Sequence, residues 1–347
     1  MKLLRILLYP FVPVYALIVK IRNLFFDKNI FKPRSVNAKI ISVGNLIVGG
    51  SGKTPAVIYL TNLLKHQGKK VGVLSRGYGR KSKGYVLVSR GEEILTSVDV
   101  CGDEIYHTVQ DCRVPAAVSE KRVGGVEKLV KETGVDTIVL DDAFQHRWIK
   151  RNLDILIFDQ SFLNEKNFFT HNLLPTGYLR ESFKETRRSD AVIVNRKFSE
   201  IQEINPRRKK YLLHKPVFTA HYRAVCFVDV AKKIQYAVED FRGQKSLIVS
   251  GIANPDSFIS ALRQTHIDTD NRLIFRDHKD YTLKDIQLIR KQFYSTNSHS
   301  VLTTEKDAVK LTNFKNEFDD IEIFYLKIEL RVDDEISFKD FILEKIS

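Results

Sequence analysis

One segment near the start of the chain strongly limits what the sequence can fold into. Residues 39–44 (KIISVG) form a short apolar run, a glycine-rich stretch follows, and residues 54–68 (TPAVIYLTNLLKHQG) carry apolar side chains at helical spacing. Glycines let consecutive backbone N–H groups face an anion, and the start of a helix adds positive potential. The sequence therefore predicts a strand, loop and helix that together bind the phosphate groups of a nucleotide.

The residues of this loop have distinct expected roles. Lys53 would reach the β- and γ-phosphates, and the Thr54 hydroxyl would bind Mg²⁺. The strict G-x-x-x-x-G-K-[ST] pattern is not met, because Ile47 stands at its first glycine. The predicted nucleotide-binding residues are Gly49, Gly50, Ser51, Gly52, Lys53 and Thr54.

A second acidic motif lies further along the chain. In DTIVLDDAFQH (136–146), an apolar strand ends in Asp141 and Asp142, where an acid would face the phosphates and hold a metal ion. We predict Thr54, Asp141 and Asp142 as magnesium ligands. The alternative is that one of the two acids caps a helix, since Asp is favoured at that position.

Other apolar runs define the fold class. Five β-branched runs, including the one that ends in Asp141 and Asp142, occur between residues 69 and 195 and are separated by basic or turn-rich segments. Runs that are apolar on both faces suit a parallel sheet covered by helices. We predict an α/β fold: a P-loop NTPase-like, mostly parallel sheet (39–212), a smaller C-terminal α/β unit (213–347) and an N-terminal membrane-associating helix (1–38).

The charge of the chain is concentrated at its start. Residues 1–91 hold 17 Lys and Arg but a single acid, Asp27, whereas the whole chain has a formal net charge of +14. Such asymmetry implies an anionic partner for this segment, which could be a membrane surface, phosphates or nucleic acid.

The first residues favour a membrane surface. The uncharged run Ile6–Val19 is short for a helix that crosses a bilayer, which needs about 20 residues. Bases flank the run on both sides, and Lys20 and Arg22 stand where a signal peptide would carry its cleavage site. We expect a helix that lies at the headgroup level of an anionic membrane, with an ordinary buried helix as the alternative.

Two protein classes are disfavoured by what the sequence lacks. Three scattered cysteines do not make a disulfide framework, so a reducing compartment is expected. A guanine-specific GTPase would need an N-K-x-D signature, and the nearest segment, VIVNRKF (192–198), has Asn195 but neither the adjacent lysine nor the acid.

Eight motifs follow one another along the chain: GNLIVGGSGKTP (44–55), LSRGYGR (74–80), GDE (102–104), LDDAFQH (140–146), LLPTGYLRE (173–181), GIANP (251–255), FRDH (275–278) and TTEKDAVK (303–310). The order and spacing of the motifs are more specific than any one of them. Taken together, these motifs resemble the tetraacyldisaccharide 4′-kinase family, the lipid A 4′-kinases, over nearly the whole chain.

The resemblance implies a function. Members of the family use ATP to phosphorylate the 4′-hydroxyl of a tetraacyldisaccharide 1-phosphate, which forms lipid IVA, at the cytoplasmic face of the inner membrane. The expected cofactors are ATP and Mg²⁺, and the expected partners are the lipid substrate and an anionic membrane surface, with no nucleic acid.

The resemblance also assigns site residues. It implies that Asp103 is the catalytic carboxylate, with His278 orienting it, and that Lys53 acts on the phosphates. The chain departs from the family at Lys279, where a second histidine is common, so only His278 is carried over.

Residues of the other motifs are expected around the lipid and the metal. Arginine binds two oxygens of a sugar phosphate at once, and tyrosine combines an apolar ring with a polar hydroxyl. The predicted substrate-binding residues are Arg76, Tyr78, Arg180 and Glu181. Gln145 and His146 are expected behind the metal ligands.

Two alternatives from other classes remain open at this stage. One is a membrane-associated P-loop ATPase without kinase activity. The other is a nucleic-acid-binding NTPase, although the basic residues at the start alternate with an apolar run and not with stacking aromatics.

Overall fold

The computed structural model describes residues 2–252, 255–277 and 279–347, and the chain divides into two compact units. Unit 1 comprises Met1–Arg196, Glu200–Ala220 and Val332–Ser347, and unit 2 comprises Lys197–Ser199 and His221–Arg331. Strand β8 (Val217–Asp229) begins in unit 1 and continues into unit 2, and β13 (Ile323–Val332) ends as the chain returns to unit 1.

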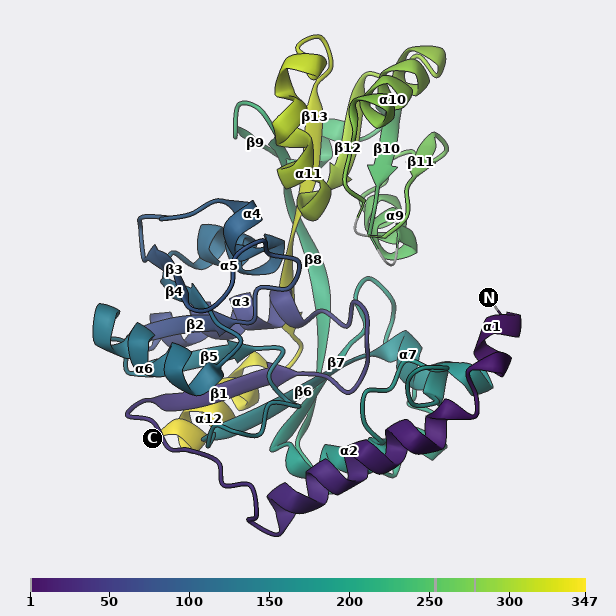
Figure 1. Cartoon of the computed structure of the whole chain (residues 1–347). Helices are drawn as coiled ribbons and strands as arrows, with labels where there is room; N and C mark the ends of the chain where they lie inside the picture. Colours follow the sequence, from purple (N-terminus) through teal and green to yellow (C-terminus); the bar gives the residue numbers. More distant parts are fainter. Residues whose placement is uncertain (1, 253–254, 278) are drawn as a thin grey trace. The chain divides into compact units, whose positions relative to one another are not determined.

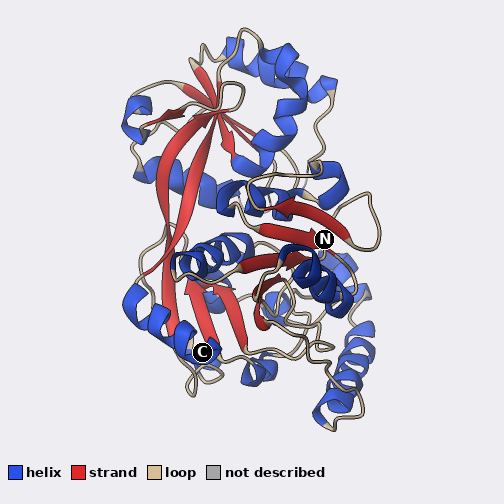
Figure 2. Ribbon diagram, turned by 90° about the vertical axis from the view of Figure 1, so that its left-hand side faces the viewer, coloured by secondary structure: helices blue, strands red, loops and turns tan. Residues whose placement is uncertain are grey.

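Unit 1 is built on a mostly parallel sheet (Figures 1 and 2). Its strand order is β8-β7-β6-β1-β5-β2-β4-β3, and of the pairs along this order only β3 with β4 is antiparallel. The strands that precede β8 are β1 (Lys39–Gly44), β2 (Val71–Ser75), β3 (Val86–Arg90), β4 (Pro115–Val118), β5 (Thr137–Asp141), β6 (Leu153–Asp159) and β7 (Ala191–Asn195).

Helices flank this sheet because its strands are apolar on both faces. On one face, Val126 and Leu129 pack with Ile40, Leu74 and Leu140. The helices of unit 1 are α1 (Lys2–Leu7), α2 (Phe11–Asp27), α3 (Lys53–His66), α4 (Val98–Cys101), α5 (Asp103–Cys112), α6 (Arg122–Thr133), α7 (Gln160–Asn164), α8 (Pro206–Lys209) and α12 (Glu335–Ile346), with 3₁₀ turns at Phe168–His171 and Phe183–Arg188.

Unit 2 is a smaller α/β unit in which β11, β10, β12 and β13 pair in parallel. The short strand β9 (Gln235–Tyr236) pairs antiparallel with β8. Its other elements are β10 (Ser246–Ser250), α9 (Pro255–Gln264), β11 (Arg272–Ile274), α10 (Leu283–Ser295), β12 (Ser300–Thr304) and α11 (Glu305–Leu311), with 3₁₀ turns at Val238–Phe241 and Thr312–Phe318.

Two of the family-like motifs, GIANP (251–255) and TTEKDAVK (303–310), meet in unit 2 at one buried carboxylate, Asp307. Its oxygens accept hydrogen bonds from the Gly251 backbone N–H (2.9 Å), the Tyr281 hydroxyl (3.0 Å) and the Thr304 hydroxyl (2.7 Å). A Cβ at Gly251 would lie 2.9 Å from the Cβ of Lys279, so this close approach requires glycine. Asp307 therefore fixes the ends of β10 and β12.

The N-terminal helix α2 lies along the outside of unit 1 (Figure 1). Asn23 and Phe26 are buried, and Phe26 packs against Trp148 with ring centroids 4.9 Å apart. Large apolar side chains on α1, α2 and the turn between them remain exposed: Ile6, Leu7, Tyr9, Phe11, Val14, Leu17, Ile18, Ile21 and Leu24. Within the described chain, no helix combines the length and apolar character needed to cross a membrane.

The α/β class and the mostly parallel, helix-covered sheet are confirmed. The division into units differs from the sequence-based boundaries at 212/213, because the last residues return to unit 1. There α12 buries Phe338, Ile342 and Ile346, and the Phe338 ring meets that of Phe218 at 4.9 Å. Phe218 and Phe338 are far apart in the sequence, so the order of the predicted elements does not reveal that their side chains pack together.

Candidate functional site

The glycine-rich loop connects β1 to α3, as the sequence predicts. A Cβ at Gly44 would lie 2.7 Å from the Phe144 Cβ, so glycine is needed where β1 passes this residue. Gly49 and Gly52 have φ of +108° and +92°, a region that favours glycine. A Cβ added at Gly49 or Gly50 would meet no described atom within 4 Å, so this part of the loop is open to a ligand.

The departure at Ile47 has a packing explanation. Ile47 is buried in a cluster with Leu46, Phe144 and Leu179, and it forms an antiparallel bridge with Leu179. The following residue continues this pairing, because the Val48 N–H donates to the Tyr178 carbonyl at 2.8 Å. The loop is thus held by an apolar anchor at the position of the missing glycine.

Arg180 joins the loop to the second acidic motif. Its guanidinium binds both carboxylate oxygens of Asp142, at 3.1 and 3.0 Å, and also donates to the Asn45 side chain at 3.1 Å. Its Nε donates to the Ile47 carbonyl at 3.0 Å. Lys53 approaches the same carboxylate, with Nζ 3.9 Å from the Asp142 Oδ1. The side chains of Lys53 and Arg180 therefore both approach the Asp142 carboxylate beside the glycine-rich loop.

Asp142 has an uncommon backbone conformation. Its φ is +47°, in the left-handed region that non-glycine residues seldom adopt, although Asp tolerates it better than most. The turn directly after β5 thus presents the carboxylate to Lys53 and Arg180. Such conformations persist where the surrounding contacts over-determine them, as these ion pairs do here.

Asp141 is the buried member of the acidic pair. Its Oδ2 accepts a hydrogen bond from the Ser75 hydroxyl at 3.3 Å, whereas its buried Oδ1 has no partner in the described part of the chain. Burial raises the pKa of the Asp141 carboxyl, and the nearby Glu104 and Asp142 add to this effect. A buried carboxylate oxygen without a partner suits a cation, and oxygen ligands of this kind are those that Mg²⁺ prefers.

The predicted catalytic carboxylate, Asp103, begins helix α5. The preceding Gly102 has φ of +92°, and a Cβ there would lie 2.8 Å from the Tyr78 carbonyl oxygen. Gly77 makes the reverse contact, because its Cβ would lie 2.9 Å from the Cys101 carbonyl oxygen. The loop that carries Tyr78 therefore packs directly against the backbone before Asp103.

The loop of residues 76–80 also connects to the acidic pair. The Gly77 N–H donates to the Ser75 hydroxyl at 3.4 Å, and Ser75 in turn contacts Asp141. Tyr78 and Arg76 are both exposed. His278, the predicted partner of Asp103, lies outside the described residues.

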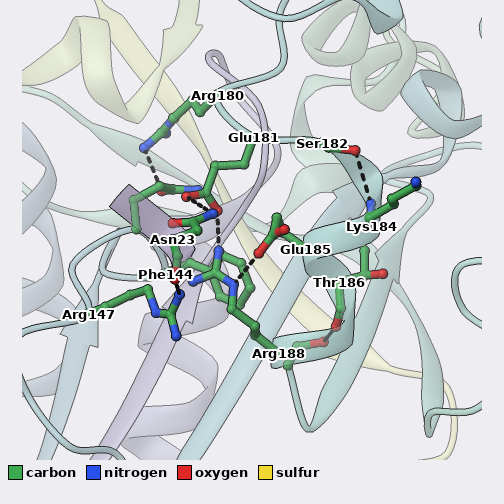
Figure 3. A network of polar contacts seen from close by, with 12 residues as sticks. Asn23, Phe144, Arg147, Arg180, Glu181, Ser182, Lys184, Glu185, Thr186 and Arg188 are labelled. Atoms are coloured by element: carbon green, nitrogen blue, oxygen red, sulfur yellow. Dashed lines mark hydrogen bonds and ion pairs between the residues drawn. The ribbon is translucent and has the colours of Figure 1, made fainter. Parts of the chain in front are cut away.

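Glu181 has different surroundings from its neighbour Arg180 (Figure 3). It is fully buried, and its two oxygens pair with Arg22 of α2 and with Arg188. The guanidinium of Arg188 lies over the Phe144 ring, 4.3 Å from its centroid, and its Nε lies 2.9 Å from Glu185. This placement favours a role in fastening α2 and does not favour contact with a substrate.

Gln145 and His146 follow the acidic pair closely in the sequence. The Gln145 side chain donates to the Asn45 carbonyl at 2.8 Å and accepts from Arg180 at 3.3 Å. Burial lowers the pKa of His146 to about 4, and Arg122, Arg151 and Arg76 contribute in the same direction. His146 is therefore a neutral imidazole at physiological pH.

Sequence reasoning missed two residues that shape the electrostatics here. Arg122, at the start of α6, is buried and interacts with both Asp141 and Asp142, and burial lowers its pKa to about 10. Asn45 binds the Ser51 hydroxyl at 2.7 Å as well as Arg180. An arginine at the start of a helix, such as Arg122, does not by itself indicate a functional residue. Asn45 could have been predicted as one, because it directly follows the first strand.

The chain matches a known protein family and several of its members. It matches the model of the tetraacyldisaccharide-1-P 4′-kinase family (LpxK) over residues 4–347. It is 37% identical over 330 residues to the tetraacyldisaccharide 4′-kinase of Phocaeicola vulgatus, covering 88% of this chain and 84% of that protein. For the tetraacyldisaccharide 4′-kinase of Aquifex aeolicus, the identity is 33% over 341 residues, with 98% of each protein covered.

A solved structure agrees with these matches. The crystal structure of LpxK from Aquifex aeolicus in complex with ATP has a TM-score of 0.80 and 31% sequence identity, and the match covers 99% of this chain and 100% of that one. On these grounds the chain belongs to the tetraacyldisaccharide-1-P 4′-kinase family.

Proposed function

We propose that this protein uses ATP to phosphorylate the 4′-hydroxyl of a tetraacyldisaccharide 1-phosphate, a step of lipid A biosynthesis. Family membership over the whole chain supports this activity, and the solved relative is an ATP complex. The observation that carries the proposal is the convergence of Lys53 and Arg180 on Asp142 at the open glycine loop. Phosphoryl transfer requires a cation near the phosphates and an acid that can hold a metal ion, and Lys53 and Asp142 are of these two kinds.

The loop residues have defined roles in this proposal. Backbone N–H groups of Gly49–Gly52 would bind the phosphates of ATP, and the Lys53 ammonium would balance the charge that develops on the γ-phosphate. The guanidinium N–H groups of Arg180 already donate to Asp142, Asn45 and Ile47. The role of Arg180 would therefore be to hold the glycine-rich loop and Asp142 in fixed positions relative to each other.

Magnesium fits the remaining acceptors. Thr54, Asp141 and Asp142 would hold the ion, and the unpartnered Oδ1 of Asp141 supports this assignment. Mg²⁺ supplies charge neutralisation on the phosphate oxygens when it is bound. Without a cation, the raised pKa of Asp141 reflects a carboxylate that burial disfavours in its charged form.

Asp103 would act as the base. Its carboxylate would accept the proton of the 4′-hydroxyl, the hydroxyl oxygen would form a bond to the γ-phosphorus, and the bond from that phosphorus to the bridging oxygen of ADP would break. His278 would orient this carboxylate. Arg76 and Tyr78, on the exposed loop packed against Gly102, would contact the sugar headgroup.

Helices α1 and α2 would hold the enzyme at the cytoplasmic face of the inner membrane. Their exposed apolar side chains form a surface suited to the headgroup level of a bilayer, and Arg5 and Lys20 would meet anionic lipid. This arrangement would bring the active site to a substrate whose acyl chains remain in the membrane.

The kinase assay uses γ-labelled ATP, Mg²⁺ and the tetraacyldisaccharide 1-phosphate in detergent micelles. We expect label in the lipid product, and Lys53→Met should abolish its formation while the protein stays folded. Release of label only as inorganic phosphate would contradict the kinase proposal.

A further inference from the structure

A surface cavity in unit 1 is not used by the proposed reaction. It has a volume of about 290 Å³. Helix α2, the 3₁₀ turns and the segment around α8 contribute its walls. The lining residues are Val12, His171, Asn172, Leu173, Leu179, Ser182, Phe183, Arg208 and Tyr211.

One wall of the cavity carries an unpaired cation. The Arg208 guanidinium lies over the Phe183 ring, 5.0 Å from its centroid. Across the described ranges it has neither an ion pair nor a side-chain hydrogen bond. Burial lowers the pKa of Arg208 and the neighbouring Arg207 adds to this, whereas Tyr211 acts in the opposite direction; a negatively charged ligand would favour the charged guanidinium. No carboxylate is among the lining residues.

A second unsatisfied donor lines the same cavity. The Asn172 Nδ2 is buried and has no hydrogen-bond partner in the described chain. A buried donor without a partner costs free energy, which a ligand acceptor would recover. His171 also lines the cavity, but its Nε2 is not free to bind a ligand, because it lies 2.9 Å from the Phe162 carbonyl oxygen.

Beside this cation, much of the lining is apolar and well packed. The Phe183 ring is stacked on Phe158 at 5.7 Å and on Tyr211 at 5.8 Å, and Leu173 and Leu179 also line the cavity. The cavity thus combines donors for an anion with a surface for a hydrocarbon, which is the chemistry of a lipid phosphate.

The position of the cavity distinguishes a membrane lipid from the acceptor substrate. Val12 belongs to α2 and lies between the exposed Phe11 and Val14, so the cavity adjoins the apolar surface of that helix. Leu179 lines the cavity, whereas the next side chain, Arg180, is directed to Asp142. The cavity therefore lies beside the proposed membrane surface and not among the ligands of Asp142.

We propose that this cavity binds the phosphate of an anionic phospholipid of the membrane, with Arg208 and Asn172 donating to the phosphate and Phe183 contacting the first part of an acyl chain. It would be a second membrane contact in addition to α1 and α2. The inference rests on the membrane association proposed above. Exposed Arg207, Lys209 and Lys210 beside the cavity would attract the anionic surface.

The test compares two neighbouring arginines in the full-length protein. Arg208→Gln removes the charge from the cavity and keeps a stem over Phe183, whereas Arg207→Gln removes the same charge from an exposed residue outside the lining. Binding is measured by co-sedimentation with phosphatidylcholine vesicles, with and without phosphatidylglycerol. Arg208→Gln should weaken binding to the phosphatidylglycerol vesicles by roughly tenfold or more. Arg207→Gln should cost about fivefold or less.

A second measurement uses monomeric dihexanoyl phosphatidylglycerol, which has no bilayer surface. Calorimetry should show saturable binding of one lipid to the wild type and to Arg207→Gln, and loss of binding in Arg208→Gln and in Asn172→Leu. Thermal melting verifies that each variant is folded. Equal losses in the two arginine variants would overturn the proposal, because they would indicate only diffuse attraction to the surface.

The substrate is the other source of a lipid phosphate. If Arg208→Gln raised the KM for the tetraacyldisaccharide 1-phosphate in phospholipid-free micelles and left vesicle binding unchanged, the phospholipid assignment would be wrong. Absence of kinase activity in the wild type would refute the proposed function but leave the vesicle comparison intact. The two proposals can therefore fail separately.

Discussion

The buried carboxylate of Glu181 makes a stability prediction that can be worked out from its contacts. Glu181 has no exposed surface. It pairs with Arg188 (Figure 3) and with Arg22 of α2. Glu181→Gln keeps the size of the side chain and removes its charge. The substitution would leave two guanidinium groups without their shared partner, so the cost is set mainly by how buried these groups are.

The two arginines differ in burial. The Arg188 side chain is 11% exposed and the Arg22 side chain is 36% exposed. Removing one partner of a buried ion pair costs about 3–5 kcal/mol. Arg188 keeps Glu185 at 2.9 Å, and Arg22 can reach water, so the lower end of this range applies. We expect Glu181→Gln to lower the free energy of unfolding of unit 1 by about 3 kcal/mol.

The chain contains a suitable reporter for this measurement. Trp148 is its only tryptophan, it belongs to unit 1, and it packs against Phe26 of α2 and against Phe31. Urea unfolding followed by its fluorescence therefore reports on the part of the chain that the Glu181 contacts hold together. The midpoint and slope of the transition give the change in free energy.

A matched control separates burial from charge. Glu203→Gln makes the same substitution in an ion pair with Lys209, in which both side chains are largely exposed. This change should cost less than about 1 kcal/mol, because exposed ion pairs contribute little. If Glu181→Gln cost no more than Glu203→Gln, the argument from its burial and its two partners would be refuted.

Three further predictions concern the base, a buried histidine and the helix surface. Asp103→Asn should lower kcat by about 10²–10⁴-fold and leave ATP affinity nearly unchanged, as steady-state kinetics and nucleotide titration would reveal. Burial lowers the pKa of His146 from its ordinary 6.5 to about 4, so the unfolded chain binds a proton there as pH falls through this window and the folded chain does not. Stability should therefore fall between pH 6.5 and 4, and His146→Gln should remove this part of the loss in urea unfolding. Replacing both Leu17 and Ile18 with serine should weaken vesicle binding by roughly tenfold or more, whereas Ile336→Ser, also on an exposed helix surface, should not change it.

Local patterns predicted the parts of the fold that local chemistry determines. The strand, glycine loop and helix at residues 39–66 follow from spacing and glycine content, and the two acids follow from their place at the end of β5. Long-range packing was not predictable in this way. The return of α12 to unit 1 depends on the contact of Phe338 with Phe218, which no local pattern signals.

The same distinction applies to the candidate site. Gly49–Thr54, Asp141 and Asp142 were predicted from motif chemistry. Arg180 and Glu181 are adjacent in sequence and share one motif, yet their side chains have opposite surroundings: one binds Asp142 and the other is buried against α2. Sequence alone could not separate the two, because residue type and spacing do not reveal which face of an irregular segment is buried.

The segment from Tyr178 to Glu181 connects the N-terminal helices to the nucleotide loop. The Tyr178 carbonyl accepts a hydrogen bond from the Val48 N–H of the loop at 2.8 Å, and the Tyr178 hydroxyl accepts one from Arg5 at 3.0 Å. The Arg180 carbonyl accepts from Tyr15 of α2 at 2.9 Å, while its side chain holds Asp142. Deleting the N-terminal helices would therefore remove support from Arg180 as well as the exposed apolar surface. A loss of activity in such a truncation cannot be assigned to membrane binding, which is why substitutions on the exposed face of α2 provide the cleaner test.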